Sequence, residues 1–303
     1  MLRHGYLKSP VHWREVDRGD LHGLWIAEVD TSDPDIVVYY AHGGGFSMGS
    51  TYFYLEFLIV WLTLLKRAGF RRPAIFALEY TLVGTLPNDA CYPTQLNQAI
   101  AGYEYVLSMV RDPSKICVGG DSAGATLILS LLLYLGKIGQ EKHPRGAKES
   151  YMPSMAVLIS PWTALTSSLY KNTRSDFLDV SNLDRYAHQY AGYDSTLSVT
   201  NHSVSIKDPL VSPGNCTSFS WWRHAAPSKG FFVAYGEEEV FAPEIQKFVG
   251  LLTKAGVVAT TSRTKGGIHA WPVASLFLSQ ADEDRHRGLR GIVEETSNRM
   301  QNC

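Results

Sequence analysis

Short apolar segments, rich in β-branched and aromatic residues, alternate along this chain with longer segments of helical periodicity. The pattern predicts strands at 36–41, 74–80, 115–120, 155–160, 230–235 and 257–263, and helices at 51–66, 94–110, 123–136, 243–255 and 282–299. Strands that are apolar along their whole length and separated by helices are typical of a mostly parallel sheet covered on both faces. We therefore expect an α/β fold.

Two regions depart from this alternation. Residues 13–30 alternate polar and apolar side chains around a Gly-Asp turn, which predicts an antiparallel hairpin at one edge of the sheet. Residues 163–225 are rich in Ser, Asn, Tyr and Trp and fit no regular alternation. We expect a single domain over residues 1–303, with a cap-like excursion over the sheet at 163–225.

Composition excludes several classes of function. Hydrophobic residues make up 45% of the 303 residues and charged ones 19%, so a sizeable core can form. The formal net charge is −1 and no Lys/Arg block occurs, which argues against nucleic-acid binding. The four cysteines have no metal-ligand spacing. The N-terminus lacks the apolar core of a secretory signal, and the apolar run at 57–65 is too short to cross a bilayer, so we expect a cytoplasmic protein without a transmembrane segment.

The sequence Gly120-Asp121-Ser122-Ala123-Gly124 places a serine between a predicted strand and a predicted helix. A serine nucleophile on so sharp a turn needs small residues two positions before and after it, because larger side chains would collide with the backbone. The turn also leaves the Ala123 N–H at a helix N-terminus, where it can stabilise a developing oxyanion. Ser122 is the candidate nucleophile; the alternative is a packing turn with an incidental serine.

Three consecutive glycines follow the first core strand, in the segment AHGGGFSMGS. Glycines adopt unusual backbone dihedral angles and leave their N–H groups unhindered, and such a loop completes the oxyanion hole of G-x-S-x-G enzymes. We expect two of Gly43, Gly44 and Gly45 to supply donors beside Ala123. His42 is expected to shape the loop rather than to act as a base.

A serine nucleophile also needs a base, which in this arrangement follows the acid in chain order. His269 lies after the last predicted strand, in KGGIHAWP, where glycines allow a loop. His224 precedes a strand, and His286 lies in the charged run DEDRHRGLR, which is typical of a solvated helix face. His269 is therefore the candidate base.

The base in turn needs an acid that orients the imidazole and stabilises its cation. Glu237, Glu238 and Glu239 directly follow the strand predicted at 230–235, at the edge of the sheet where the other candidates are expected. These residues by themselves do not distinguish which of the three carboxylates serves the base.

The H-G-G-G-F loop at 42–46 and the G-D-S-A-G turn at 120–124 resemble the hormone-sensitive-lipase branch of the α/β-hydrolases, which includes carboxylesterases and steryl-acetate deacetylases. The resemblance extends from about Val37 to Trp271 and implies an α/β-hydrolase fold. The family's acid stands three residues after a glycine, the place that Glu239 has here, with Glu for Asp. The resemblance therefore implies a triad of Ser122, Glu239 and His269.

Two features depart from the family. Thr81 stands where the family has an arginine, and few residues precede the glycine loop to form the N-terminal helices that often cap the site. The cap is therefore expected to rest mainly on residues 163–225. Aromatic residues of this excursion either line the substrate pocket or belong to the core: Tyr170, Phe177, Tyr186, Trp221 and Trp222.

The function expected from these motifs is hydrolysis of a carboxylic ester through an acyl-enzyme, with a small to medium apolar ester or an acetyl ester as substrate. No metal or organic cofactor is implied. One alternative is an acyltransferase that uses the same triad, and another is a non-catalytic small-molecule receptor of the same fold. The expected partner is the ester itself, and a homodimer is left open.

Overall fold

The computed structural model describes residues 11–28, 33–84, 90–142, 151–193 and 204–301. Within these ranges one sheet has eight strands in the order β1-β2-β4-β3-β5-β6-β7-β8. The strands are β1 (His12–Arg18), β2 (Leu21–Ala27), β3 (Ile36–Ala41), β4 (Pro73–Leu78), β5 (Ile116–Asp121), β6 (Met155–Ile159), β7 (Phe231–Gly236) and β8 (Ala259–Thr264). From β4 through β8 all neighbours pair in parallel, whereas β1 and β2 form the antiparallel hairpin predicted at the edge.

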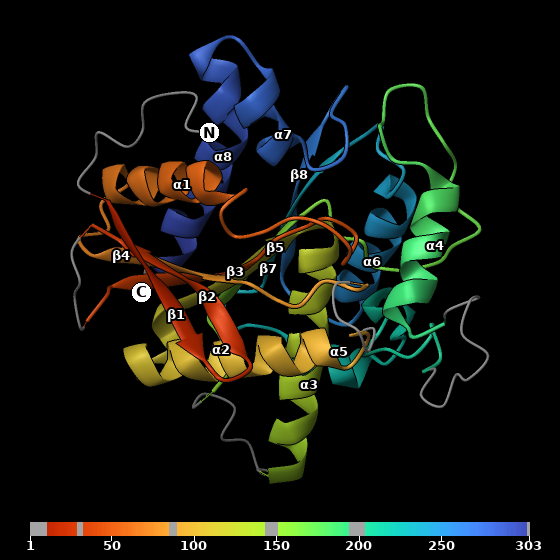
Figure 1. Cartoon of the computed structure of the whole chain (residues 1–303), viewed down its shortest axis with the longest axis horizontal. Coiled ribbons are helices and arrows are strands. Elements are labelled where there is room, and N and C mark those ends of the chain that lie inside the picture. Colours follow the sequence, from red (N-terminus) through yellow and green to blue (C-terminus); the bar gives the residue numbers. More distant parts are fainter. Residues whose placement is uncertain (1–10, 29–32, 85–89, 143–150, 194–203, 302–303) are drawn as a thin grey trace.

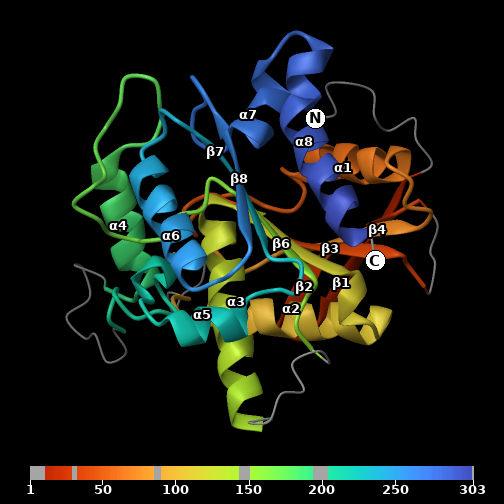
Figure 2. The same ribbon diagram turned by 180° about the vertical axis from the view of Figure 1, so that it is seen from behind.

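Helices cover both faces of the sheet (Figures 1 and 2). On one face α1, α7 and α8 pack over a core of their own, and on the other α2, α3, α5 and α6 bury the second and larger core. The helices are α1 (Leu55–Arg67), α2 (Thr94–Val110), α3 (Ser122–Lys142), α4 (Val180–Tyr190), α5 (Phe219–Ala225), α6 (Ala242–Lys254), α7 (Trp271–Leu278) and α8 (Asp282–Met300). The predicted α/β architecture is therefore confirmed.

Burial along the strands follows their place in the sheet. Every residue of β3 through β7 is buried, because helices cover both faces of these strands. The two edge strands, β1 and β8, instead bury only Val16 of β1 and consist mostly of exposed and half-buried residues, many of them polar or charged. Such residues discourage the unpaired strand edges from pairing with other chains.

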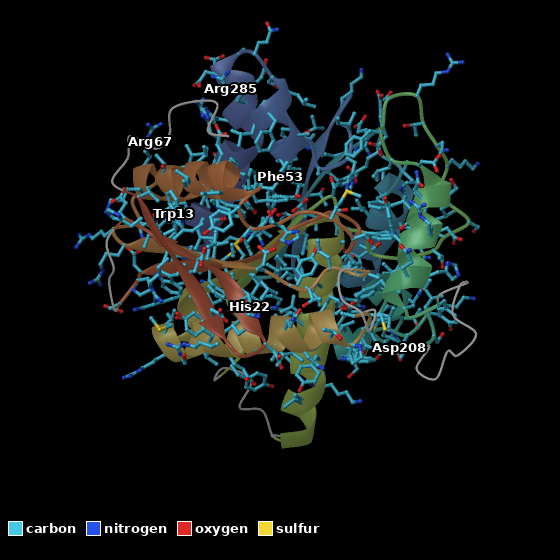
Figure 3. The ribbon with its side chains drawn as sticks, viewed as in Figure 1. Trp13, His22, Phe53, Arg67, Asp208 and Arg285 are labelled. Carbon is cyan, nitrogen blue, oxygen red and sulfur yellow. The ribbon has the colours of Figure 1, made fainter. Side chains whose placement is uncertain are left out.

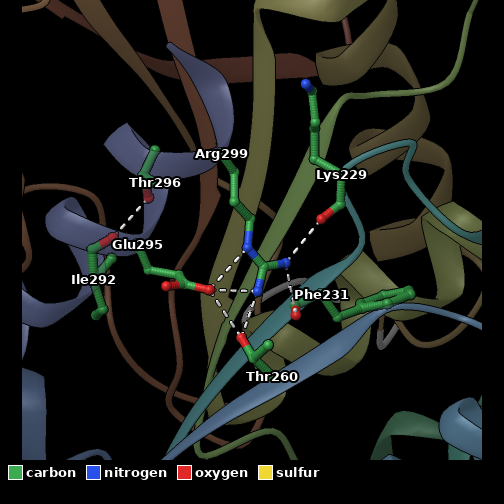
Figure 4. Close-up of polar contacts among 7 residues, drawn as sticks. All are labelled: Lys229, Phe231, Thr260, Ile292, Glu295, Thr296 and Arg299. Atoms are coloured by element: carbon green, nitrogen blue, oxygen red, sulfur yellow. Dashed lines mark hydrogen bonds and ion pairs between the residues drawn. The ribbon is translucent and has the colours of Figure 1, made fainter. Parts of the chain in front are cut away.

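Polar contacts fasten the end of α8 to the β7–β8 edge (Figure 4). Arg299 donates to the carbonyl oxygens of Lys229, at 2.8 Å, and Phe231, at 3.2 Å, and it also contacts Glu295 and Thr260. At the other end of this layer Phe53, just before α1, contacts the ring of Phe277 in α7 with centroids 5.7 Å apart (Figure 3). The helices on this face are thus tied to the sheet through Arg299 and to one another through the contact of Phe53 with Phe277.

The predicted excursion contains α4 and α5 and no strand among its described residues, 163–193 and 204–225; its residues 194–203 lie outside the described ranges. The α5 helix packs against α3 and belongs to the core of the larger layer. The α4 helix lies farther out, and buries Leu183, Ala187 and Tyr190 toward that core. The α5 part of the excursion therefore belongs to the core, and a cap over the site remains a prediction.

One helix of the described residues has the length and composition of a membrane span. It is the stretch Ser122–Gly139 of α3, and 83% of that stretch is buried inside the fold. Burial on this scale is the pattern of a core helix. The cytoplasmic location remains a prediction from the sequence.

The strand order has a direct consequence for the site. The chain passes from β3 outward to β4 and then returns to the other side of β3 to form β5, so β3 lies between the two. Such a reversal leaves a crevice at the carboxyl ends of the two strands that separate there, which is where open α/β sheets bind ligands. Ala41, the last residue of β3, pairs with Gly120 near the end of β5. The glycine loop and the serine turn therefore leave the sheet side by side.

The first turn of α3 approaches β3 so closely that only glycine fits. A Cβ atom on Gly124 would lie 2.1 Å from the Ala41 carbonyl oxygen and 2.4 Å from that of His42. A Cβ atom on Gly120 would lie 2.7 Å from the same Ala41 oxygen. The requirement for small residues on both sides of the serine is thus a matter of backbone contact.

We predict that Gly124→Ala lowers the free energy of unfolding by about 1–3 kcal/mol or more, since α3 must move off β3 to admit the methyl group. Gly250→Ala in α6 is the matched control, because a Cβ atom there would meet nothing within 4 Å. It should raise stability by about 0.5–1 kcal/mol through the lower backbone entropy of alanine. Urea unfolding measures both, and equal midpoints for Gly124→Ala and the parent would contradict the steric account.

Candidate active site

Ser122 occupies a strained turn between β5 and α3. Its φ angle is 51°, a left-handed conformation that residues other than glycine adopt at a cost of about 1–3 kcal/mol. The Ser122 carbonyl oxygen accepts from the backbone N–H of Trp162 at 3.2 Å, which helps to hold the turn. Ala123 follows in the first turn of the 21-residue helix α3, where N–H groups lack intrahelical acceptors. The serine and a free donor therefore stand together at a helix N-terminus.

The glycine loop does not present its three N–H groups equally. Gly43 donates its N–H to Asp121 Oδ1 at 2.8 Å, so this donor is already engaged. Gly44 and Gly45 have φ angles of 117° and 61°, which turn the chain sharply beside the serine turn. Among the described residues neither of these two N–H groups has an acceptor. The geometry favours Gly44 and Gly45 as the donors of the loop.

The Asp121 side chain connects the serine turn to the glycine loop, a contact that the sequence motifs did not predict. Its buried carboxylate accepts from the hydroxyls of Tyr40 and Tyr54, each at 2.7 Å, and from the Gly43 N–H. Burial raises the pKa of Asp121 to about 6, against the opposing effect of these hydrogen bonds. The signal in the sequence was a carboxylate at the end of an otherwise apolar buried strand.

His42 packs within the loop, as expected for a residue that shapes it. Its ring stacks on that of Tyr80 with centroids 4.4 Å apart, and the Tyr80 hydroxyl donates to the His42 carbonyl oxygen at 2.8 Å. The Nδ1 atom lies 2.7 Å from the Gly43 carbonyl oxygen. Burial lowers the pKa of His42, so the ring is a neutral structural element.

The three candidate glutamates lie in three different environments. Glu237 pairs with Arg263 at 2.7 Å, and Glu238 is exposed. Glu239 is buried, and its Oε2 accepts from Ser160 Oγ at 2.6 Å and from the Gly236 N–H at 3.2 Å. Its Oε1 is buried with no hydrogen-bond partner in the described structure.

The acidity of Glu239 reflects this burial. Loss of hydration is the largest effect and raises the pKa of Glu239 to about 8. The hydrogen bonds from Ser160 and Gly236 oppose this shift, and the nearby charge of Asp176 adds to it. Glu239 is therefore a carboxyl group that can change its protonation state near neutral pH.

His269 lies in the turn between β8 and α7 and is buried. The edge of its ring meets Phe241 and Phe177, with centroids 4.9 and 5.8 Å apart, and burial lowers the pKa of His269 to about 3. Its Nδ1 has no hydrogen-bond partner in the described structure, a property that it shares with Glu239 Oε1. The imidazole is therefore neutral, and its unpartnered Nδ1 is available to an orienting carboxylate.

Ser160 links the turn of Glu239 to the loop of His269. Its hydroxyl donates to Glu239 Oε2 and accepts from the N–H of Ala270, the residue after His269, at 2.9 Å. Ser160 directly follows β6 in a left-handed conformation, with φ at 44°, and is fully buried. The two candidate triad residues are thus anchored to one hydroxyl group.

The other histidines lie elsewhere. His224 is half-buried in α5, on the layer that packs against α3. His286 lies in α8 and is buried, with Nδ1 3.4 Å from Asp282, so the solvated position predicted for it was wrong. Helix α8 packs against α7 and α1, so several of its positions, His286 among them, are buried despite their charged neighbours.

The excursion contributes two aromatic side chains near the candidate site. The ring of Tyr186 in α4 lies 3.0 Å from where a Cβ atom on Gly45 would be, and exposed Phe177 meets His269. Of the other predicted lining residues, Tyr170 and Trp222 are core, and Trp221 donates to the Leu133 carbonyl oxygen at 2.8 Å.

A cavity of about 440 Å³ opens on the face covered by α1, α7 and α8, between β7, β8 and α8. Basic and hydroxyl side chains are prominent in its lining, among them Ser262, Arg263, Lys265 and Arg287. None of Ser122, Glu239 and His269 lines it, so this cavity is separate from the candidate active site.

Comparison with known proteins places this geometry in a family. The sequence profile of the steryl acetyl hydrolase family matches residues 13–280. The putative steryl acetyl hydrolase mug81 of Schizosaccharomyces pombe is 28% identical over 85% of this chain and 64% of its own length. Steryl acetyl hydrolase 1 of Saccharomyces cerevisiae is 25% identical over 70% of this chain and 46% of its own length. The chain thus spans about half to two thirds of the length of these relatives.

Solved structures agree with the fold. A hormone-sensitive-lipase homologue from a metagenome library, EstE7, superimposes with a TM-score of 0.73 at 21% identity, covering 96% of this chain and 87% of that one. Carboxyl esterase 2 of Tuber melanosporum gives a TM-score of 0.70 at 22% identity, over 96% and 86% of the two chains. The chain has the α/β-hydrolase fold predicted from its glycine loop and serine turn, and it belongs to the steryl acetyl hydrolase family.

Proposed function

We propose that this chain hydrolyses carboxylic esters through an acyl-enzyme formed on Ser122. The observation that carries the proposal is the left-handed serine turn, which brings Ser122 and the N–H of Ala123 beside the free N–H groups of Gly44 and Gly45. An ester carbonyl bound there meets a nucleophile and donors for its oxyanion at the same time. Membership of a family described as steryl acetyl hydrolases supports the reaction class.

His269 is the proposed base and Glu239 the acid that orients it. Ser122 Oγ attacks the carbonyl carbon while its proton passes to His269 Nε2, and Glu239 stabilises the resulting cation through Nδ1–H. The tetrahedral intermediate collapses when His269 protonates the leaving alkoxide. Water then attacks the acyl-enzyme by the same route and releases the carboxylic acid. The unpartnered Glu239 Oε1 and His269 Nδ1 support this pairing, because catalytic hydrogen bonds are often long before substrate binds.

A small acyl group, such as acetyl, fits the surroundings of the glycine loop. Tyr186 lies against Gly45, and Phe46, the next residue, stacks on Tyr190 with ring centroids 3.7 Å apart. These rings leave little room beside the proposed oxyanion donors. The relatives named steryl acetyl hydrolases, and one from Streptomyces hygroscopicus named acetyl-hydrolase, support an acetyl ester of an apolar alcohol.

Replacing the nucleophile should abolish turnover. Ser122→Ala is expected to lower kcat for p-nitrophenyl acetate by roughly 10⁴-fold or more, since no other group can form the acyl-enzyme. It should also end covalent labelling by a fluorophosphonate. In that reaction the serine oxygen bonds to phosphorus and fluoride leaves. Ser108→Ala, at an exposed position of α2, is the control and should retain both activities. Labelling that survives in Ser122→Ala would refute the assignment.

The acid should be visible in the pH profile. Burial raises the pKa of Glu239 to about 8 and lowers the pKa of His269, so His269 is already neutral in this pH range. The fraction of enzyme with an ionised Glu239, which is the active form, therefore increases as pH rises through about 8. We predict that kcat/KM, corrected for spontaneous hydrolysis, rises through this range. Glu239→Gln should remove this rise and lower kcat by roughly 10²–10⁴-fold. Glu238→Gln, at the exposed neighbour, should leave the pH profile intact. If the rise is lost in that variant instead, Glu239 is not the acid.

Asp121 should act through the glycine loop. Asp121→Ala deprives Gly43 of its acceptor, which should loosen the neighbouring donors and lower kcat by roughly 10²-fold, with a smaller change in KM. Asp121→Asn keeps an oxygen for Gly43 and Tyr40, while its amide can donate to Tyr54, so most activity should remain. Steady-state kinetics of the two variants tests this order, and equal losses would show that the charge rather than the hydrogen bond matters.

A further inference from the structure

The carboxylate of Asp176 accepts three backbone hydrogen bonds at the centre of the candidate site. Asp176 lies in the excursion between β6 and α4 and is 9% exposed. Its Oδ1 accepts from the N–H of His269 at 3.1 Å and from that of Phe177 at 2.9 Å, and its Oδ2 accepts from the N–H of Val240 at 2.8 Å. A short loop of the excursion is thus bonded to two segments that follow different strands.

Those two segments carry the proposed acid and base. Val240 follows Glu239 in the turn after β7, and His269 is the proposed base after β8. Asp176 bonds to the backbone on both sides, one oxygen to each segment. Rotation of either segment away from the other would therefore break a hydrogen bond to a buried carboxylate, which costs more than a bond to a neutral group.

Thr173 supports this arrangement from the same loop. Its hydroxyl donates to the Glu238 carbonyl oxygen at 3.0 Å and accepts from the Asp176 N–H at 3.0 Å. Asp176 is thus held from its own backbone, and the turn of Glu239 has two attachments to the excursion.

We propose that Asp176 is a positioning residue for ester hydrolysis, because its carboxylate holds the turn of Glu239 and the loop of His269 in register. This inference rests on the proposed function of Ser122, Glu239 and His269. Ser160 ties the same two segments through Glu239 Oε2 and the Ala270 N–H. The two segments that carry the proposed acid and base are therefore joined by two bridges, one through Ser160 after β6 and one through Asp176 of the excursion.

The position requires a carboxylate rather than an amide. Both oxygens of Asp176 face N–H donors, so the amide group of an asparagine would oppose at least one donor with another. The charge has a second effect, because Asp176 adds to the larger effect of burial in raising the pKa of Glu239. The charged group that acts on Glu239 is Asp176 from the excursion, and burial, together with Glu244 and Glu239, raises the pKa of Tyr170. His269 belongs to the loop after β8 that Ser160 joins to the turn of Glu239.

The test compares Asp176→Asn with Asp179→Asn in the full-length chain. Asp179 is a partly exposed carboxylate of the same loop that caps α4 by accepting from the Asn182 N–H, and it has no contact with either triad segment among the described residues. Asp176→Asn should lower kcat for p-nitrophenyl acetate by roughly tenfold to a hundredfold with little change in KM, because a small misplacement of catalytic groups costs that much. It should also move the alkaline rise of kcat/KM to lower pH, since a negative charge near Glu239 is gone. Asp179→Asn should change neither.

The shift in the pH profile separates positioning from mere stability. A folded Asp176→Asn variant with parental kcat and an unmoved profile would overturn the inference. If Asp176→Asn fails to fold, Thr173→Val is tested instead. This variant keeps the Asp176 carboxylate but loses both hydrogen bonds of the Thr173 hydroxyl. It should lower kcat several-fold while its thermal unfolding temperature stays near that of the parent. A parental kcat there would also overturn the inference. Failure of the proposed function has a different signature, namely a parent that neither hydrolyses the ester nor reacts with a fluorophosphonate at Ser122.

Discussion

The contact between the first turn of α3 and the carboxyl end of β3 determines the arrangement around Ser122. A Cβ atom on Gly124 or Gly120 would strike the Ala41 carbonyl oxygen, so both positions are restricted to glycine. With α3 so close, the chain has room for one left-handed residue between β5 and the helix, and Ser122 is that residue. The same contact brings the glycine loop, which leaves β3 at Ala41, within reach of the Asp121 side chain. The nucleophile and its proposed oxyanion donors therefore depend on one steric constraint.

Three buried carboxylates lie in the segments that build the candidate site, and each makes a different set of hydrogen bonds. Asp121 is fully occupied by two tyrosine hydroxyls and the Gly43 N–H, which makes it a rigid support for the loop. Asp176 accepts from three backbone N–H groups and connects two loops. Glu239 alone keeps an unpartnered oxygen, and burial raises its pKa. A buried polar atom without a partner is costly, so an unpartnered oxygen on Glu239 and an unpartnered Nδ1 on His269 are more consistent with a role in chemistry than with a role in stability.

Local sequence patterns predicted much of this fold, because helices and buried strands are specified by the spacing of apolar residues within a short segment. The helix at Thr94–Val110 was predicted to its exact bounds, and the predicted core strands agree with β3 to β8 within a few residues, since apolar strands between helices leave few other arrangements. His286 was the clear failure. Its charged neighbours indicated a solvated face, yet the packing of α8 on the rest of the fold buries it. The role of Asp121 was missed because it depends on tyrosines from β3 and from the turn before α1.

The sequence by itself determined the α/β class, the serine turn and the glycine loop, because each follows from short-range sterics and from the period of apolar residues. The residues by themselves left Glu237, Glu238 and Glu239 equivalent, with only the family resemblance favouring Glu239, and they left three glycines for two donor positions. The tertiary structure gives these residues different surroundings: Glu239 is the one buried beside Ser160, and Gly43 has its N–H bonded to Asp121. The bridge from Asp176 to both triad segments likewise joins residues 64 and 93 positions apart. Burial and hydrogen bonding between residues so distant in the chain arise only when the sheet brings its loops to one edge.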